Sequence, residues 1–207
     1  IVSRNILKLS KLENKIKKIN PSVIVFKIVS DLSTLNGAKK IIKEFKNQNK
    51  IKKIDVLINS AANFRVKKIR DITVKNLLED FQLNVITPFL LSQFFSIDMC
   101  KKKNGIIVNI GSSSSYSSSK NTSVYCATKH ALLGMSRSFH VELREHNVRS
   151  IIVSPGSMKT SMGKKVKNQD YNTFIDPKDV ARMIKQIIID QNNMVIDEIK
   201  LNRMQYK

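Results

Sequence analysis

The 207-residue sequence predicts an α/β fold, a doubly wound parallel sheet with helices on both faces. Short, nearly continuous runs of β-branched and apolar residues alternate with longer segments whose apolar residues recur at helical spacing. Several of the short runs end directly before small or polar residues, and ligands bind beyond the carboxyl ends of strands in such sheets. With 42% hydrophobic residues, the chain is long enough for one well-buried domain, expected over residues 1–207.

The first half of the chain contains three expected strands. Residues 1–5 resemble the end of a strand that feeds a helix, which continues to Ile19 and ends at Asn20 and Pro21. Residues 23–31 form the next expected strand, followed by a helix over 35–45, and residues 54–63 form a third, buried strand.

The second half alternates in the same way. Residues 74–103 predict one long helix broken by Pro88, followed by a strand from residue 106 to about Gly111 and a helix over 124–143. A strand over 148–156 precedes a polar, lysine-rich segment, 161–174, that is typical of a mobile lid. Asp176 and Pro177 begin the last helix, and residues 194–201 give the last strand.

Three polar residues follow the strand that ends near Gly111. Ser112 is expected at the rim of the ligand crevice, because it comes directly after the strand's carboxyl end. Tyr125 and Lys129 stand at i and i+4 on a helical pattern, so their side chains share one face. A lysine in that position favours the phenolate, which lowers the phenol's pKa from about 10 and makes it a usable proton donor or acceptor.

Ser112, followed by Tyr125 and Lys129 within YCATK, resembles the Ser, Tyr-x-x-x-Lys signature of the short-chain dehydrogenase/reductase family. The resemblance extends over essentially the whole chain and implies a Rossmann-like domain. It implies an NADP(H)-dependent oxidoreductase that interconverts a carbonyl and a secondary alcohol by hydride transfer. Tyr125 would then be the proton donor or acceptor, Ser112 would hydrogen-bond the substrate oxygen, and Lys129 would hold the nicotinamide ribose. Asn84, in FQLNVITPF, resembles the asparagine that holds a water in the family's proton relay.

The resemblance also assigns residues to the adenosine half of a cofactor. Arg4 follows the first strand, where the family places the arginine that meets the 2'-phosphate of NADP, so NADP(H) is favoured over NAD(H). The alternative for Arg4 is an exposed arginine in a turn. Asp31 and Leu32 resemble the adenine-contacting position, and the alternative for Asp31 is a cap on the following helix.

Two further turns match the family in part. Asn59, Ser60, Ala61 and Ala62 resemble its NNAG turn but depart from it at two of four positions, which puts a positive φ at Ala62 in doubt. Pro155 and Gly156, followed by Thr160, resemble the PG turn whose threonine contacts the nicotinamide carboxamide.

The family's TGxxxGxG turn is not found in this sequence, which begins with Ile1. We therefore expect a fragment cut about thirty residues into the domain, lacking the first strand and helix. Such a fragment is expected to bind dinucleotide only weakly and to leave two unpaired strand edges.

The net charge of +21 raises the question of nucleic-acid binding. The lysines are scattered, and no RNP-like strand, zinc knuckle or helix-turn-helix pattern accompanies them, so a nucleic-acid partner is not expected. The alternative to an enzyme is a non-catalytic basic binding protein, for nucleotide or nucleic acid, on the same scaffold. The two cysteines show no CxxC or Cys/His spacing, so no metal site is expected.

The expected partners are a small carbonyl or alcohol substrate and further copies of the chain. The resemblance implies a homodimer or homotetramer formed by the apolar faces of the helices over 74–103 and 124–143, and ordinary packing onto the sheet is the alternative. No apolar run predicts a membrane span and no signal peptide is recognisable, so a cytoplasmic protein is expected.

Overall fold

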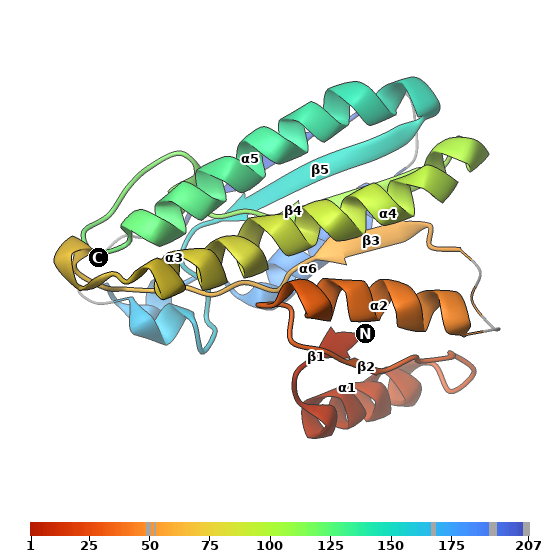
Figure 1. Cartoon of the computed structure of the whole chain (residues 1–207), viewed down its shortest axis with the longest axis horizontal. Helices are drawn as coiled ribbons and strands as arrows, with labels where there is room; N and C mark the ends of the chain where they lie inside the picture. The colour runs from red at the N-terminus through yellow and green to blue at the C-terminus, as the bar shows by residue number, and fades with distance from the viewer. Residues whose placement is uncertain (49–50, 52, 167–168, 191–193, 205–207) are drawn as a thin grey trace. The chain divides into compact units, whose positions relative to one another are not determined.

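A computed structural model of the chain describes residues 1–48, 51, 53–166, 169–190 and 194–204. Two compact units make up the chain, Ile1–Lys52 and Lys53–Lys207. Each unit contains its own parallel sheet, with two strands in the first and four in the second (Figure 1). The parallel α/β architecture expected from the sequence is confirmed, whereas the division into one domain stays a prediction.

The first unit contains β1 (Val2–Ser3), α1 (Ile6–Ile19), β2 (Ile28–Val29) and α2 (Leu35–Asn47). The strand expected over 23–31 is much shorter than predicted, because β1 offers only two residues for ladder pairing. Asn5 caps α1 by accepting a hydrogen bond from the Lys8 N–H at 3.1 Å. The strand–helix–strand order at the N-terminus agrees with the sequence pattern.

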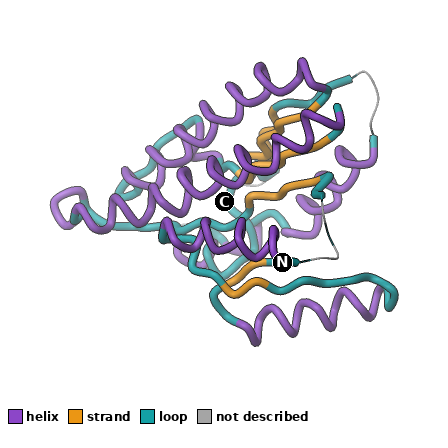
Figure 2. Tube along the Cα trace, turned by 45° about the vertical axis from the view of Figure 1, so that its right-hand side comes forward, coloured by secondary structure: helices purple, strands orange, loops and turns teal. Residues whose placement is uncertain are grey.

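The second unit is built on four parallel strands in the order β3 (Val56–Asn59), β4 (Gly105–Ile110), β5 (Val148–Pro155) and β6 (Glu198–Leu201). Figure 2 shows these strands side by side in orange. The expected strands at 54–63 and 194–201 are each reduced to four residues. The central strands, β4 and β5, match their predicted ranges closely.

Three helical segments cover the sheet of the second unit. The long helical run consists of α3 (Val74–Phe81), a π-helical turn (Gln82–Ile86) and α4 (Thr87–Lys102). It lies with α5 (Ser123–Leu143) on one face of the sheet, and α6 (Pro177–Ile189) covers the other face (Figure 1). Short 3₁₀ turns occupy the loops, at Ile69–Asp71, Ser113–Ser115, Arg144–His146, Gly163–Lys165 and Tyr171–Thr173.

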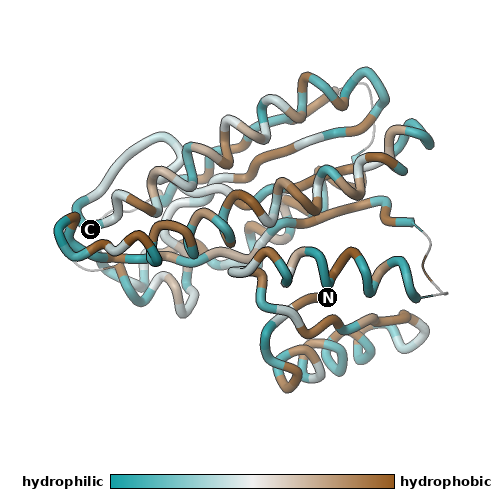
Figure 3. The backbone as a smooth tube through the Cα atoms, viewed as in Figure 1, coloured by the Kyte–Doolittle hydropathy of each residue, from teal (hydrophilic) through white to brown (hydrophobic). Residues whose placement is uncertain are grey.

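Side chains of the central strands alternate between two apolar layers. Ile106, Val108, Ile151 and Val153 pack with Val180 of α6, whereas Ile152 packs with leucines of α5. Figure 3 shows the corresponding apolar colour along β4 and β5. Because both faces of these strands are buried, their sequences are continuous apolar runs rather than alternating ones.

The long helical run is the one segment, within the described residues, that could cross a membrane by length and composition. A core helix passes the same test, and Leu91, Phe95 and Met99 of α4 are buried within the second unit. Asp80 and Asn84 are also buried along this run. The expectation of no membrane span stays a prediction, with core packing as the physical account of the apolar side chains.

A series of hydrogen-bonded polar side chains, here called the polar chain, is buried between the sheet and the helices α4 and α5. The Asn59 amide donates to Asn109 Oδ1 at 2.9 Å and to Ser92 Oγ at 3.1 Å. Asn109 donates in turn to Ser136 Oγ at 3.2 Å, and Ser136 lies 3.3 Å from Ser150 Oγ. The polar chain links β3, β4 and β5 to α4 and α5. Its hydrogen bonds satisfy polar groups that are buried away from water.

Replacing Asn109 with alanine should lower the free energy of unfolding by about 2–4 kcal/mol, because the Asn59 amide and the Ser136 hydroxyl each lose a buried partner. Urea unfolding followed by circular dichroism measures the change. The control is Asn104→Ala at an exposed position, where a change within about 0.5 kcal/mol is expected. Equal stability of the two variants would contradict the importance of the polar chain.

Candidate active site

The loop after β4 places Ser112 at the carboxyl end of the sheet. A Cβ on Gly111 would overlap the Ser154 hydroxyl and press on the buried Ile152 side chain, so glycine suits this close approach to β5. Ser112 Oγ accepts a hydrogen bond from the Ser114 N–H at 3.1 Å, and Ser115 Oγ accepts one from the Ser112 N–H at 3.3 Å. This capping box fixes the orientation of Ser112 at the rim where the sequence predicted it.

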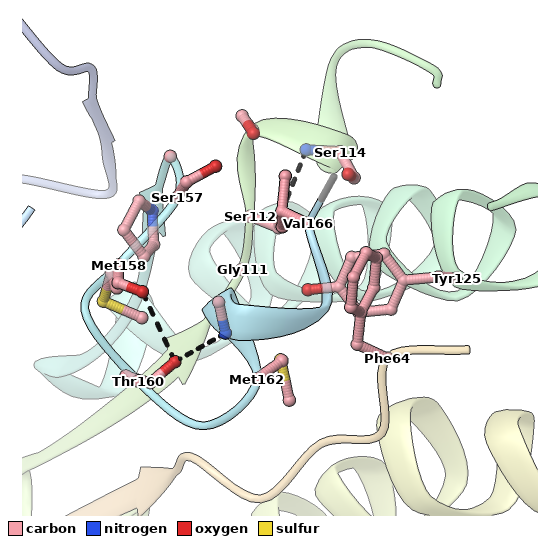
Figure 4. A pocket seen from close by; sticks show the side chains of 14 residues that line it. Phe64, Gly111, Ser112, Ser114, Tyr125, Ser157, Met158, Thr160, Met162 and Val166 are labelled. Carbon is pink, nitrogen blue, oxygen red and sulfur yellow. Dashed lines mark hydrogen bonds between the residues drawn. The ribbon is translucent and has the colours of Figure 1, made fainter. Parts of the chain in front are cut away.

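Tyr125 and Lys129 lie in the first turns of α5, and both side chains are buried, with exposed fractions of 7% and 3%. Tyr125 lines a pocket together with Ser112 and Phe64 (Figure 4). The Phe64 ring meets the Tyr125 ring edge-on, with centroids 4.8 Å apart and an interplanar angle of 74°. The serine and tyrosine of the predicted signature therefore line one pocket.

The Lys129 ammonium is directed to the end of β4. Its Nζ donates to the Ile110 carbonyl oxygen at 2.7 Å and lies 5.8 Å from the centroid of the Tyr125 ring. Burial lowers the pKa of Lys129 to about 8, because the charged form is desolvated. In the part of the chain that the structure describes, no carboxylate forms an ion pair with it.

The pKa of Tyr125 is shifted in the direction opposite to the prediction. Burial raises it above its usual value, and a hydrogen bond with Ser112 offsets only part of that effect. The sequence pattern identified the neighbouring lysine but gave no measure of how deeply the phenol is buried. With the protein's own groups alone, Tyr125 is therefore a neutral phenol at pH 7.

Asn84 lies inside the π-helical turn between α3 and α4. Its Oδ1 accepts from the Asn63 N–H at 2.8 Å, and its Nδ2 donates to the Asn63 carbonyl and to Thr128 Oγ1, both at 3.0 Å. Both side-chain N–H groups are thus used. Pro88, four residues on, has no N–H to donate to the Asn84 carbonyl, so the ordinary α-helical bond to that carbonyl does not form.

The sequence predicted a long helix broken by Pro88, and the regular α-helix is indeed interrupted directly before this residue. The run remains helical, and Pro88 stands in the first turn of α4, where a missing N–H is tolerated. The irregularity lies just before it, in the turn Gln82–Ile86. π-turns of this kind occur frequently at functional sites.

The turn after β5 forms the other side of the pocket. Pro155 is the last residue of β5, and Gly156 donates its N–H to the Leu201 carbonyl at 2.8 Å. Thr160 Oγ1 accepts from the Gly163 N–H at 3.0 Å (Figure 4). All three predicted residues line the pocket with Tyr125.

The turn after β3, unlike the turn after β5, contributes none of its predicted residues to the lining of this pocket. The Asn59 side chain is buried in the polar chain described above, so a ligand could reach only its backbone. Ser60 and Ala61 are exposed at the carboxyl end of β3. Ala62 does not adopt a positive φ, which resolves the doubt raised by its replacement of glycine.

In the first unit, Arg4 and Asp31 line a cavity of about 460 Å³ together with Lys40, whereas Leu32 is not part of its lining. Arg4 Nη1 lies 3.8 Å from Asp31 Oδ2, and both side chains are well exposed. Hydrogen bonds from Ser33, and less so the charge of Arg4, hold the pKa of Asp31 below its usual value. Leu32, which follows Asp31, is half-buried.

The alternative role of Asp31 as a helix cap is wrong. Thr34 caps α2, with its Oγ1 accepting from the Gly37 N–H at 3.0 Å. Asp31 instead accepts from the Ser33 N–H and hydroxyl, at 3.0 and 2.7 Å. Its carboxylate is thus held in a turn beside Arg4, in the lining of the cavity.

Sequence reasoning missed the segment after β3 that carries Phe64. Arg65 donates from Nε to Asp80 Oδ2 at 2.8 Å and from Nη2 to Asp80 Oδ1 at 3.0 Å, and this pairing raises the pKa of Arg65. Asp80 is only 1% exposed. An aspartate within the apolar helix pattern VKNLLEDF was the available signal, since an unpaired carboxylate would not be buried there.

The pocket combines a phenol and a serine hydroxyl at the carboxyl end of a parallel sheet, and the buried Lys129 ammonium lies outside it, 5.8 Å from the centroid of the phenol ring. These groups can orient an oxygen atom and move a proton to or from it. No cluster of three or more His, Cys, Asp or Glu side chains that could hold a metal ion occurs among the described residues.

A family model described as short chain dehydrogenase matches residues 1–171 of the chain. Among curated proteins, carbonyl reductase family member 4 from Xenopus laevis is 28% identical over 160 residues, which are 74% of this chain and 67% of that protein. The chain spans between 43% and 67% of the length of eight curated relatives that it matches.

Solved structures share the fold. An alcohol dehydrogenase from the archaeon Thermococcus sibiricus, complexed with 5-hydroxy-NADP, matches with a TM-score of 0.82 and 19% identity, over 100% of this chain and 85% of that chain. 4-Hydroxyisoleucine dehydrogenase complexed with NADH matches with a TM-score of 0.80 and 24% identity, over 92% and 83%. The Rossmann-like fold expected from the sequence is confirmed, and the chain belongs to the short-chain dehydrogenase family.

Proposed function

We propose that the protein is an NADP(H)-dependent oxidoreductase that interconverts a carbonyl compound and a secondary alcohol. The observation that carries this proposal is the buried ammonium of Lys129, held against the end of β4 one helical turn from Tyr125. A lysine buried without a counter-ion destabilises the fold, and such groups gather at functional sites. Packing alone gives no reason to keep a charge at this position.

In each unit, taken by itself, the residues present suit groups that a nicotinamide dinucleotide carries. In the first unit, Arg4 and Lys40 line the same cavity and suit a phosphate, while the Asp31 carboxylate can accept from an amino group. In the second, Thr160 and Ser112 offer hydroxyls beside Tyr125. Similar structures carry either NADH or an NADP derivative, so the preference for NADP(H) rests on Arg4.

The cofactor, when bound, would supply or accept the hydride. Ser112 would donate a hydrogen bond to the substrate oxygen, turning its hydroxyl hydrogen from Tyr125 to the substrate while its Oγ still accepts from the Ser114 N–H. Tyr125 would transfer the proton to or from that oxygen. Lys129 has two ammonium hydrogens beyond the one given to Ile110, and these would bind the ribose and favour the phenolate.

The role proposed for Asn84 belongs to its backbone. Both N–H groups of its side chain are already donated to protein oxygens, whereas Pro88 provides no helical N–H to its carbonyl. That carbonyl would hold the relay water that resupplies the proton to Tyr125 through Lys129.

The net charge of +21 favours a second candidate, a basic binding protein without catalysis. Loose electrostatic binding weakens steeply as salt rises, whereas a dinucleotide held in a built site is less affected. NADPH affinity at low and moderate salt therefore separates the two candidates. Assembly as a homodimer or homotetramer, and a cytoplasmic location, stay predictions; exposed Phe89 and Val141 on α4 and α5 suit the proposed assembly.

Replacing Tyr125 with phenylalanine should lower turnover by about 10²–10⁴-fold and leave NADPH affinity nearly unchanged, because only one hydroxyl is removed. Steady-state rates and equilibrium binding, in protein expressed from the complete coding sequence, measure both. Tyr116→Phe removes the same group outside the pocket and should keep wild-type turnover. Full activity of the Tyr125 variant would refute the proposed proton transfer.

Replacing Lys129 with methionine should change how stability depends on pH. The folded chain holds Lys129 at a pKa of about 8, below the unfolded value of about 10.4, so the unfolded chain binds the extra proton between these values. The free-energy cost of burying the charged ammonium is fully present below pH 8 and decreases as the pH rises above that value. Wild type should therefore gain about 2–3 kcal/mol relative to the variant between pH 7 and 10 in urea unfolding. A pH-independent difference would show that the ammonium is not buried at this cost.

Replacing Arg4 with alanine should weaken NADPH binding by about 1.5–3 kcal/mol and leave NADH binding nearly unchanged, because only NADPH carries the 2'-phosphate. Isothermal titration with each cofactor tests this. Arg70, also exposed and beside an aspartate, provides the control, since Arg70→Ala should affect neither cofactor. Equal losses for both cofactors after the Arg4 change would leave Arg4 as an ordinary turn residue.

A further inference from the structure

The pocket at Tyr125 has an uncharged wall in a strongly basic protein. None of the described residues that line it carries a charged side chain, although the chain has a net charge of +21. Its apolar part comes from Phe64, Met158, Met162 and Val166, and its polar part from serine, threonine and tyrosine hydroxyls. Figure 4 shows Phe64 against Tyr125, with Met158 and Thr160 on the other side.

Three cationic side chains close to the pocket in sequence or space make contacts outside it. Lys129 does not line the pocket, and its ammonium donates to the Ile110 carbonyl. The guanidinium of Arg65 is paired with Asp80 and Glu79. Lys165 is exposed, with its ammonium 3.5 Å from the Phe64 carbonyl oxygen, at the backbone rather than in the pocket. A carboxylate placed beside the substrate carbonyl would therefore lose its water without gaining a cation from the described lining of the pocket.

Phe64 is held in place on both sides. Asn63, before it, exchanges two backbone hydrogen bonds with the Asn84 side chain. Arg65, after it, makes a two-point contact with the buried Asp80 carboxylate. The pocket that the ring lines has a volume of about 100 Å³. A fixed ring beside Tyr125 limits the group that can lie next to the reacting carbon.

We propose that the substrate is an uncharged carbonyl compound or alcohol with a compact apolar group next to the reacting carbon, and that Phe64 enforces this choice. This rests on the proposed oxidoreductase function. The surface charge attracts anions to the protein, but the wall formed by Phe64, Met162 and Val166 excludes a carboxylate from the reacting position. Metabolites with a carboxylate or phosphate directly beside the carbonyl are therefore poor substrates.

The test compares three carbonyl compounds that differ at one group: 3-methyl-2-butanone, 3-methyl-2-oxobutanoate and the methyl ester of that acid. The ketone and the ester should exceed the acid in kcat/KM by about 100-fold or more, and the ester controls for size. Rates are measured by NADPH oxidation in protein expressed from the complete coding sequence. Equal or faster turnover of the acid would overturn the inference while leaving hydride transfer intact. Failure to reduce any of the three with NADPH or NADH would count against both proposals.

A second experiment introduces a positive charge into the lining of the pocket. Phe64→Lys should raise the acid-to-ester ratio of kcat/KM by at least about 10-fold, because the carboxylate gains a cation inside the pocket. Val66→Lys adds the same charge to an exposed position that does not line the pocket, and should leave the ratio unchanged. Equal shifts in the two variants would mean that general surface charge, not the pocket wall, governs the choice.

Discussion

The hydrogen bond from the Lys129 ammonium to the Ile110 carbonyl fixes the geometry of the candidate active site. Ile110 is the last residue of β4, two residues before Ser112, and Tyr125 lies one turn before Lys129 on α5. One bond of 2.7 Å therefore ties the helix that carries the phenol to the strand that carries the serine. The bond places a charge in the core, so the fold gives up stability to hold it there.

Paired polar groups hold the surrounding parts of the second unit. Asn84 hydrogen-bonds the backbone of Asn63, Asp80 pairs with Arg65, and Asn109 joins the central strands to α5. Each of these side chains is buried and hydrogen-bonded, which avoids the cost of an unsatisfied polar group. The result is a rigid frame around a pocket whose own lining is uncharged.

The sequence predicted the parts of the site that depend on local spacing. Ser112, Tyr125 and Thr160 line one pocket as expected, because the ends of parallel strands and the face of one helix can be read from the sequence pattern. Strand lengths were overestimated at residues 23–31, because pairing depends on a partner strand distant in sequence. The sequence also does not show how deeply a side chain is buried, so the predicted direction of the Tyr125 pKa shift was wrong. Phe64 and the Arg65–Asp80 pair went unnoticed for the same reason, since a long-range contact gives each its role.

Transfer of label from cofactor to product tests the central claim most directly. Protein expressed from the complete coding sequence would reduce an uncharged ketone with NADPH deuterated at both C4 positions of the nicotinamide, and mass spectrometry would locate the label. The site built around Ser112, Tyr125 and Lys129 predicts one deuterium on the carbinol carbon of every product molecule. Alcohol formed without deuterium, or cofactor oxidised without alcohol, would contradict direct hydride transfer at this site.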